Sequence, residues 1–193
     1  MTKILITGTN SFVGRNFLQY SKFTDIDEIS LFDNLPENID FGKYDVVIHL
    51  VAIVHETIRI PDEKYFTINK DLCLKVANYA KKAHVKQFIF LSSVKVYGRF
   101  ISGNEPWNEK STCMPEDAYG KSKHAAELAL KEIEDKGFIV SIIRTPLVYG
   151  EHVRANMLNI MKLLILCLFC HLKIFITDEI LQVPRTLSAL LTG

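Results

Sequence analysis

Cysteine is scarce in this chain: only Cys73, Cys113, Cys167 and Cys170 occur among its 193 residues. Thiols this few and this widely spaced do not supply a disulfide framework, and they favour a reducing compartment. We therefore expect a cytoplasmic protein. Cys73 falls on the apolar face of a predicted helix, where we expect it to be a small core residue.

An excess of charge of either sign is also absent. The chain carries 23 Lys and Arg residues against 22 Asp and Glu residues, a net charge of +1, and the two signs are interspersed. Such a balance gives no basic cluster that would bind nucleic acid or an anionic membrane surface. The partner that we expect is a small molecule.

Long apolar runs are missing too. The run in "MTKILITGTNSFVG" is broken by Gly8 and Asn10, so we expect no signal peptide. The run from Leu163 to Phe175 is interrupted by a histidine and a lysine, and it is shorter than the ~20 residues of a membrane-spanning helix. With 48% hydrophobic residues, the chain suits one domain with part of a second.

Short apolar segments alternate with longer segments of helical period, which predicts a parallel sheet. Continuously apolar strands such as "DVVIHLVA" imply helices on both faces of that sheet. The sequence thus predicts a doubly wound α/β fold, in which ligands bind outside the carboxyl ends of the strands. The predicted strands are 3–7, 28–32, 44–52, 86–93 and 138–144, and the predicted helices are 12–23, 63–83 and 118–137.

The first strand leads into "ITGTNSFVG", a glycine-containing turn at the start of a helix. Gly8 permits a tight turn, Gly14 permits close packing of helix and strand, and free amides at the helix start suit a pyrophosphate. Ser11 stands where the dinucleotide-binding fingerprint has its middle glycine. Dinucleotide binding is the favoured interpretation, and a purely structural turn is the alternative.

Asp33 is expected at the end of the second strand, where its carboxylate would accept the ribose hydroxyls of NAD. The alternative is an ordinary turn aspartate before Asn34. The polar segment from Asp33 to Lys43 leads straight to the next strand and is too short for a full helix. This shortened crossover leaves the choice between NAD and NADP open.

The segment "YGKSK" places Tyr119 and Lys123 four residues apart, on one face of a helix. An ammonium beside a phenol would lower the tyrosine pKa toward the working pH, as a general acid or base requires. Ser92 and Ser93 end the preceding strand, where a hydroxyl could bond the same substrate oxygen. Alternatively, the tyrosine and lysine decorate a surface helix and the serines merely end the strand. His49 and His124 are expected to be packing or helix-surface residues.

At these residues the sequence resembles the extended short-chain dehydrogenase/reductases, in particular the NAD-dependent epimerase/dehydratase group. The matching stretches are "ILITGTNSFVG", "DVVIHLVA", "YFTINKDL", "FIFLSSVKVYG", "AYGKSKHAAE" and "IIRTPLVYG". They follow the family's order and spacing from residue 3 to about residue 162. The resemblance implies a Rossmann domain over residues 1–162 and an incomplete substrate domain.

The resemblance also implies a role for individual residues. Tyr119 would be the acid/base, Lys123 its pKa-lowering and ribose-binding partner, and Ser93 the hydroxyl that bonds substrate. Asn69 resembles a helix residue that supports the active-site strand, and Asn156 one that reaches a sugar diphosphate. No metal is expected. The residues expected to contact the dinucleotide are Gly8, Ser11, Phe12, Val13, Gly14, Asp33, Leu50, Val51, Ala52, Tyr119, Lys123, Pro146 and Val148.

The activity implied by the resemblance is epimerisation or dehydration of a UDP- or dTDP-hexose through a transient keto sugar. A UDP-hexose 4-epimerase that makes polysaccharide precursors is the preferred form, and full-length relatives would be homodimers. Three alternatives stay open: a nucleotide-sugar reductase or dehydratase, a catalytically silent dinucleotide-binding fragment, and a sensor tethered to a membrane through residues 163–193.

The segment 163–193 departs from the family. Its Cys-x-x-Cys-His pattern at Cys167 is that of haem attachment, which would require an export signal. When "KIFITDEILQVPRTL" is back-translated with permitted codons and read from the third base, it gives N-F-Y-N-R-R-N-F-T-S-A-K-N-L, like the family's missing segment. We therefore interpret residues 163–193 as a frameshifted remnant of the substrate domain, which the nucleotide sequence of the gene would test.

Overall fold

The computed structural model describes residues 1–54, 60–98 and 106–148. The chain divides into two compact units. The larger unit consists of Met1–Thr9 and Asp25–Pro146 and holds the whole sheet, and the smaller consists of Asn10–Thr24 and the chain from Leu147 onward. The predicted boundary at residue 162 lies outside the described residues, as does the interpretation of residues 163–193.

Five parallel strands form the sheet, in the order β2-β1-β3-β4-β5. From β1 the chain passes to β2 on one side and then returns to β3 on the other, so the predicted doubly wound topology is confirmed. The strands are β1 (Ile4–Thr7), β2 (Ile26–Ile29), β3 (Val46–His49), β4 (Gln87–Ser93) and β5 (Ile139–Thr145).

The central strands β1 and β3 and most of β4 consist of buried residues, many of them β-branched or aromatic. All four residues of β1 and of β3 are buried, as are Phe88, Ile89 and Phe90 in β4. In register, Thr7 at the end of β1 lies beside His49 at the end of β3, so these carboxyl ends are level. Such continuous burial is typical of a parallel sheet with both faces covered.

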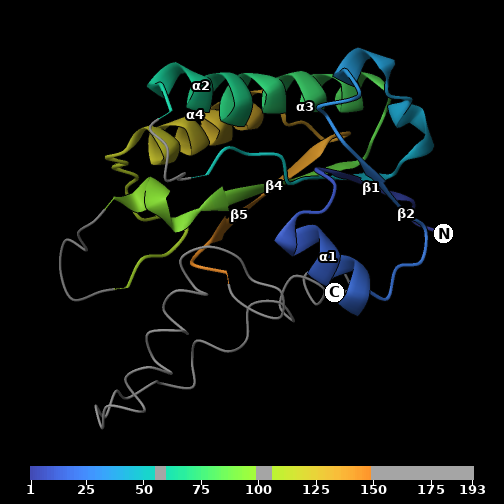
Figure 1. Cartoon of the computed structure of the whole chain (residues 1–193), viewed down its shortest axis with the longest axis horizontal. Coiled ribbons are helices and arrows are strands. Elements are labelled where there is room, and N and C mark those ends of the chain that lie inside the picture. Colours follow the sequence, from blue (N-terminus) through green and yellow to red (C-terminus); the bar gives the residue numbers. More distant parts are fainter. Residues whose placement is uncertain (55–59, 99–105, 149–193) are drawn as a thin grey trace, which may run out of the picture. The chain divides into compact units, whose positions relative to one another are not determined.

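One long helical segment follows β3, and a second helix follows β4. The first runs through α2 (Asp62–Phe66), a π-helical stretch η3 (Thr67–Leu72) and α3 (Cys73–Lys82), and the second is α4 (Ala118–Ile133). Figure 1 shows the long segment from α2 to α3 and helix α4 lying side by side along one face of the sheet. The core between these layers contains Leu5, Val47, Val76, Ala77, Phe88, Phe90, Ala126, Leu130 and Phe138.

The crossover from β2 to β3 confirms one prediction and corrects another. It holds only two single turns of 3-10 helix, η1 (Pro36–Asn38) and η2 (Phe41–Lys43), and no full helix. However, β2 ends at Ile29, earlier than the predicted strand, because the backbone turns and the Asn34 amide donates to the Ser30 carbonyl. Asp33 therefore lies exposed within a turn and not at a strand end.

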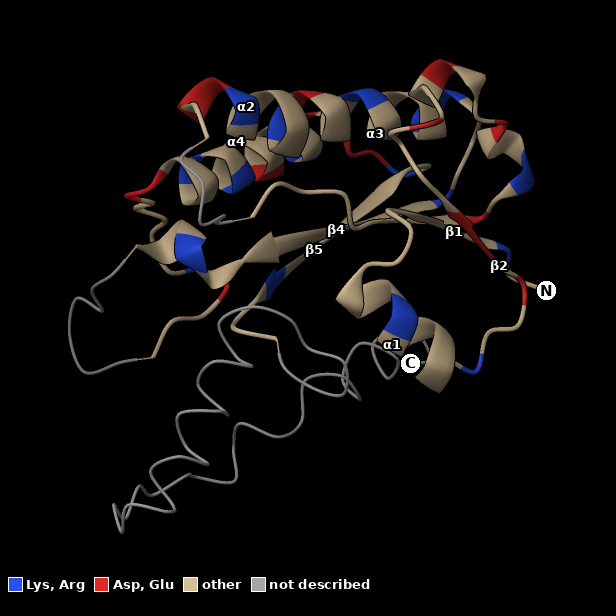
Figure 2. Ribbon diagram, viewed as in Figure 1, with Lys and Arg blue, Asp and Glu red and all other residues tan. Residues whose placement is uncertain are grey.

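Helix α1 (Phe12–Tyr20) belongs to the smaller unit. Its N-cap is Ser11, whose hydroxyl accepts a 3.0 Å hydrogen bond from the Gly14 amide. A capping hydroxyl of this kind satisfies one of the free amides that every helix start presents. In the described parts of the chain, every helix is too short or too polar to cross a bilayer. Figure 2 shows both acidic and basic residues along the helical segment from α2 to α3 and along α4.

Candidate active site

The two serines at the carboxyl end of β4 have different partners. Ser92 is buried and donates a 2.5 Å hydrogen bond to Oε1 of Glu127. Ser93 is the N-cap of the 3-10 turn η4 (Val94–Tyr97), and its hydroxyl accepts a 3.3 Å hydrogen bond from the Lys95 amide. The predicted end of β4 at Ser93 is confirmed. The two serine hydroxyls differ in their partners, since Ser92 bonds Glu127 and Ser93 caps η4.

Helix α4 presents three chemically active side chains at intervals of four residues: Tyr119, Lys123 and Glu127. This spacing places them on one face, as predicted for the first two. The helix begins at its N-cap Asp117, whose carboxylate accepts a 2.7 Å hydrogen bond from the Gly120 amide. The cap thus fixes the first turn, which carries Tyr119.

The expected lowering of the Tyr119 pKa is wrong for the protein without cofactor. Burial raises the pKa of Tyr119, and the Asp117 carboxylate raises it further, while a hydrogen bond with the Ser93 hydroxyl acts in the opposite direction. The Lys123 ammonium does not relieve this effect because it is directed elsewhere. Ser93, and not Lys123, is the group that favours the phenolate here.

Lys123 is almost completely buried, with 3% of its surface exposed. Its Nζ donates a 2.8 Å hydrogen bond to the Leu91 carbonyl and lies 4.6 Å from the centre of the Phe90 ring. Burial lowers the pKa of Lys123 to about 8. The lysine therefore joins α4 to the backbone of β4, and it loses its proton at a lower pH than an exposed lysine does.

Asn69, in the π-helical stretch η3, supports the segment that follows β3. Its amide bonds both backbone groups of Ile53, accepting at 2.8 Å from the amide and donating at 3.0 Å to the carbonyl. A third hydrogen bond of 3.0 Å runs to the Ser122 hydroxyl on α4. Asn69 thus connects the segment after β3 to α4.

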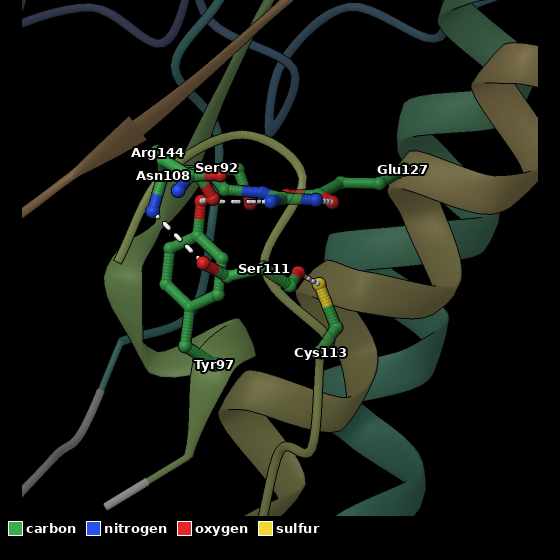
Figure 3. Close-up of polar contacts among 7 residues, drawn as sticks. All are labelled: Ser92, Tyr97, Asn108, Ser111, Cys113, Glu127 and Arg144. Carbon is green, nitrogen blue, oxygen red and sulfur yellow. Dashed lines mark hydrogen bonds and ion pairs between the residues drawn. The ribbon is translucent and has the colours of Figure 1, made fainter. Parts of the chain in front are cut away.

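An ion pair that the sequence did not predict joins Glu127 on α4 to Arg144 on β5. Glu127 accepts hydrogen bonds from Arg144 on β5 through Nη2 at 2.7 Å and through Nε at 3.1 and 3.2 Å. Arg144 Nη1 also donates to the Tyr97 hydroxyl at 2.8 Å, which donates at 2.9 Å to the Asn108 carbonyl. Figure 3 shows these side chains converging between α4 and the ends of β4 and β5.

A second, more exposed ion pair lies beside Tyr119. Lys95 Nζ is 2.7 Å from Asp117 Oδ2 and 6.0 Å from the centre of the Tyr119 ring. The backbones also meet here, because a Cβ on Gly120 would lie 2.8 Å from the Lys95 carbonyl oxygen. Glycine at this position allows η4 to approach the start of α4.

The turn after β1 fits a dinucleotide. Gly8 has a φ of +107°, and a Cβ there would lie 3.2 Å from Val51 Cγ2. Leu50 donates its amide to the Thr7 carbonyl at 3.0 Å. The structure therefore brings Gly8, Leu50 and Val51 together between β1 and β3, where the direction of winding reverses. Dinucleotides bind at this point in folds of this topology.

The remaining predicted contact residues are placed as follows. Ala52 follows Val51 in the same segment of the larger unit, and Pro146 is exposed just after β5. Ser11, Phe12, Val13 and Gly14 start α1 in the smaller unit, to which Val148 also belongs. Asn156 lies outside the described residues.

The other singled-out residues pack as expected. His49 is buried, shares a 2.8 Å hydrogen bond with the Thr7 hydroxyl and stacks on Phe88 and Phe90. Burial lowers the pKa of His49 to about 3. Cys73 is a buried free thiol. His124 comes within 4.8 Å of Cys113 and Glu127, but both oxygens of that carboxylate are engaged by Arg144 and Ser92.

The family profile of the NAD dependent epimerase/dehydratase family matches residues 4–171. The chain is 31% identical to the UDP-glucose 4-epimerase of Vibrio cholerae over an alignment 187 positions long, which covers 83% of this chain and 56% of that protein. It is 29% identical to the N-acetyl-alpha-D-glucosaminyl-diphospho-ditrans,octacis-undecaprenol 4-epimerase of Escherichia coli O157:H7, over 82% of this chain and 53% of that one.

Among solved structures, the fold is similar to that of the UDP-glucuronic acid 4-epimerase of Bacillus cereus in complex with NAD. The TM-score is 0.64 at 24% identity, and the match covers 79% of this chain and 58% of that one. The chain spans about half the length of the curated relatives it matches.

Proposed function

The chain belongs to the NAD dependent epimerase/dehydratase family, and from that premise we propose that it is the dinucleotide-binding and catalytic part of an enzyme acting on nucleotide-activated sugars. One observation carries the proposal. The Ser93 hydroxyl at the end of β4 forms a hydrogen bond with the Tyr119 phenol at the start of α4. Lys123 lies one turn further along the same face of that helix.

NAD is the proposed cofactor, and NADP is the alternative. Bound NAD would supply an acceptor for a hydride from a sugar carbon. The turn at Gly8 and the segment 50–52 would hold the dinucleotide, together with residues 11–14, Asp33, Pro146 and Val148. Lys123 would bind its ribose.

The reaction chemistry of the chain itself is proton transfer. Tyr119 would take the proton of the sugar hydroxyl while Ser93 bonds the same oxygen, and the product is a keto sugar. Because burial raises the pKa of Tyr119, the proton transfer would depend on the Ser93 hydrogen bond and on the charge of the bound cofactor. Asn156 would reach the sugar diphosphate.

For the substrate we propose a UDP-hexose, epimerised at carbon 4 for polysaccharide precursors. Its support is the likeness over 83% of this chain to a UDP-glucose 4-epimerase. The alternative within the family is a dehydratase or reductase acting on a dTDP-hexose, which would use the same tyrosine and serine. Substrate choice depends on groups that contact the sugar, and these lie largely beyond the nucleotide-binding sheet.

The test uses the purified full chain. Acid release of bound nucleotide identifies NAD or NADP, and proton NMR follows UDP-glucose, UDP-galactose, their N-acetyl forms and dTDP-glucose. We expect bound NAD and conversion of a UDP-sugar. The variant Tyr119→Phe should lower the turnover rate by about 10²-fold or more and should still bind the dinucleotide. Turnover that persists undiminished in Tyr119→Phe would overturn the proposed role.

A catalytically silent dinucleotide-binding chain is the second candidate. Its support is the Tyr119 phenol, whose pKa is raised by burial, because a protonated phenol cannot accept the proton of a sugar hydroxyl. Bound NAD without conversion of any sugar in the panel would favour this candidate.

A further inference from the structure

A buried chain of hydrogen bonds joins the strand end that carries Ser93 to the helix that carries Tyr119. We propose that Ser92, Glu127 and Arg144 are positioning residues that hold the Ser93 hydroxyl against the Tyr119 phenol. The inference rests on the proposed function for the roles of Ser93 and Tyr119. It assigns to Ser92 a different task from that of its neighbour.

The geometry of the link begins in the sheet. Ser92 on β4 and Arg144 on β5 are register partners on adjacent parallel strands. Both side chains reach the same carboxylate, since Ser92 donates to Glu127 Oε1 at 2.5 Å and Arg144 donates to both oxygens. Glu127 is thus held by two neighbouring strands at once, and only 1% of its surface is exposed.

The Glu127 carboxylate and the Tyr119 phenol also belong to the same helix, α4. Glu127 lies eight residues after Tyr119 on α4, which is just over two turns along the same face. A carboxylate fixed to β4 and β5 therefore sets both the rotation and the axial position of the helix. Ser93 is the residue that immediately follows Ser92, so the same contact fixes the other member of the pair.

Two further hydrogen bonds hold the strand ends. The Thr145 hydroxyl donates to the Ser92 carbonyl at 3.1 Å. Arg144 Nη1 donates at 2.8 Å to the hydroxyl of Tyr97, the last residue of η4, and the Tyr97 ring stacks on Trp107. The turn that follows Ser93 is therefore attached to the same arginine (Figure 3).

A gain in stability is a weak explanation for the Glu127–Arg144 ion pair, because the desolvation of two largely buried charges offsets most of their attraction. Geometry is a stronger one. A hydroxyl displaced by about 1 Å from a reacting oxygen loses most of its contribution to the rate. Contacts that fix Ser93 relative to Tyr119 from two strands and one helix suit that requirement.

Several other groups surround the tyrosine, and a test must separate their effects from that of Ser93. Among the described residues, the ionisable side chains near Tyr119 include Tyr65 on α2, Lys95 on η4, Asp117 at the N-cap and Lys123 on α4. A Ser92→Ala substitution leaves all of these charges in place. It removes one hydrogen bond and leaves Arg144 paired with Glu127.

The test labels tyrosine with ¹³C at Cζ in the full-length, cofactor-free chain. The Tyr119 signal is assigned by its loss in Tyr119→Phe, and it reports the hydrogen bond and ionisation of that phenol. We expect Ser93→Ala to move the signal and to shift its titration upward. Ser92→Ala and Glu127→Gln should move it in the same direction. Ser141→Ala is the matched control, since its hydroxyl joins the same two strands through Gln87 at 2.9 Å.

The inference is overturned if Ser92→Ala and Glu127→Gln, folded by circular dichroism, leave the signal at its wild-type position while Ser93→Ala moves it. It is equally overturned if Ser93→Ala has no effect. If the wild-type chain turns over a sugar, Ser92→Ala should also lower kcat by about tenfold with little change in KM. Absence of turnover would count against the proposed function only, because the NMR result is read without substrate.

Discussion

Lys123 Nζ donates a hydrogen bond to the Leu91 carbonyl oxygen at 2.8 Å, across the interface between α4 and β4. A single hydrogen bond to a neutral carbonyl does not replace the hydration of an ammonium, so the charged form of this lysine is costly in the folded chain. Burial consequently lowers the pKa of Lys123 from 10.5 to about 8.

Lys123 should make the chain more stable as the pH rises. Between about pH 8 and pH 10.5 the unfolded chain holds a proton that the folded chain has released, so the free energy of unfolding increases with pH through this window. The contribution is about 3 kcal/mol in total. Urea unfolding of the wild type and of Lys123→Met should show a difference that grows over this range, while the exposed Lys121→Met follows the wild type. Parallel curves for wild type and Lys123→Met would contradict the expectation.

His49 should act at acidic pH. Its pKa is lowered to about 3 by burial, against 6.5 for an ordinary histidine, so the unfolded chain binds the extra proton between these values. Stability is therefore complete above about pH 6.5 and falls by up to ~1.4 kcal/mol for each pH unit below it.

The variant His49→Gln cannot titrate, and its stability should fall less steeply than that of the wild type from pH 6.5 to pH 4. Thermal unfolding across this range measures the slopes. The exposed His84 provides the control, because His84→Asn should keep the wild-type slope. An unchanged slope in His49→Gln would show that other groups dominate acid unfolding.

Local patterns were enough to predict that there are five strands here, the doubly wound fold and the places where β4 ends and α4 begins, although not where β2 ends. Ser93 and Tyr119 could be found because a strand end and a helix start have signatures within a few residues. The glycine turn at Gly8 was predictable for the same reason. In each case the physical cause lies in neighbouring residues of the chain.

The features that the sequence did not predict depend on contacts between distant segments. Glu127 and Arg144 read as an ordinary helix residue and an ordinary strand residue, and their pairing appears only when β5 lies beside β4. The upward pKa shift of Tyr119 comes from burial, which periodicity alone does not measure. Asp33 was placed at a strand end because its neighbours are apolar, but the Ser30–Asn34 hydrogen bond ends β2 earlier.

Asn69 should be among the most important polar residues for stability. It is fully buried and bonds the amide and carbonyl of Ile53 and the hydroxyl of Ser122. Asn69→Ala would leave the amide and carbonyl of Ile53 without these partners, while Ser122 would keep its hydrogen bond to the Tyr119 carbonyl, and the cost would be about 2–4 kcal/mol. Asn78→Ala on α3 is the matched control, since within the described residues the Asn78 side chain bonds the Leu74 carbonyl one turn before it. Urea midpoints that shift equally in the two variants would refute the special role of Asn69.

Gly120 provides a test of the contact between η4 and α4. In an exposed helix interior, Gly→Ala normally stabilises by about 1 kcal/mol. Here the added Cβ would lie 2.8 Å from the Lys95 carbonyl oxygen and 3.2 Å from Asp117 Oδ1, and a backbone carbonyl cannot move away without displacing η4. We expect Gly120→Ala to lower the free energy of unfolding by about 1–3 kcal/mol. Gly42→Ala, where the nearest atom is at 3.4 Å, should be close to neutral. A Gly120→Ala chain as stable as the wild type in urea would mean that η4 yields without cost, and that the turn after Ser93 is not held firmly against α4.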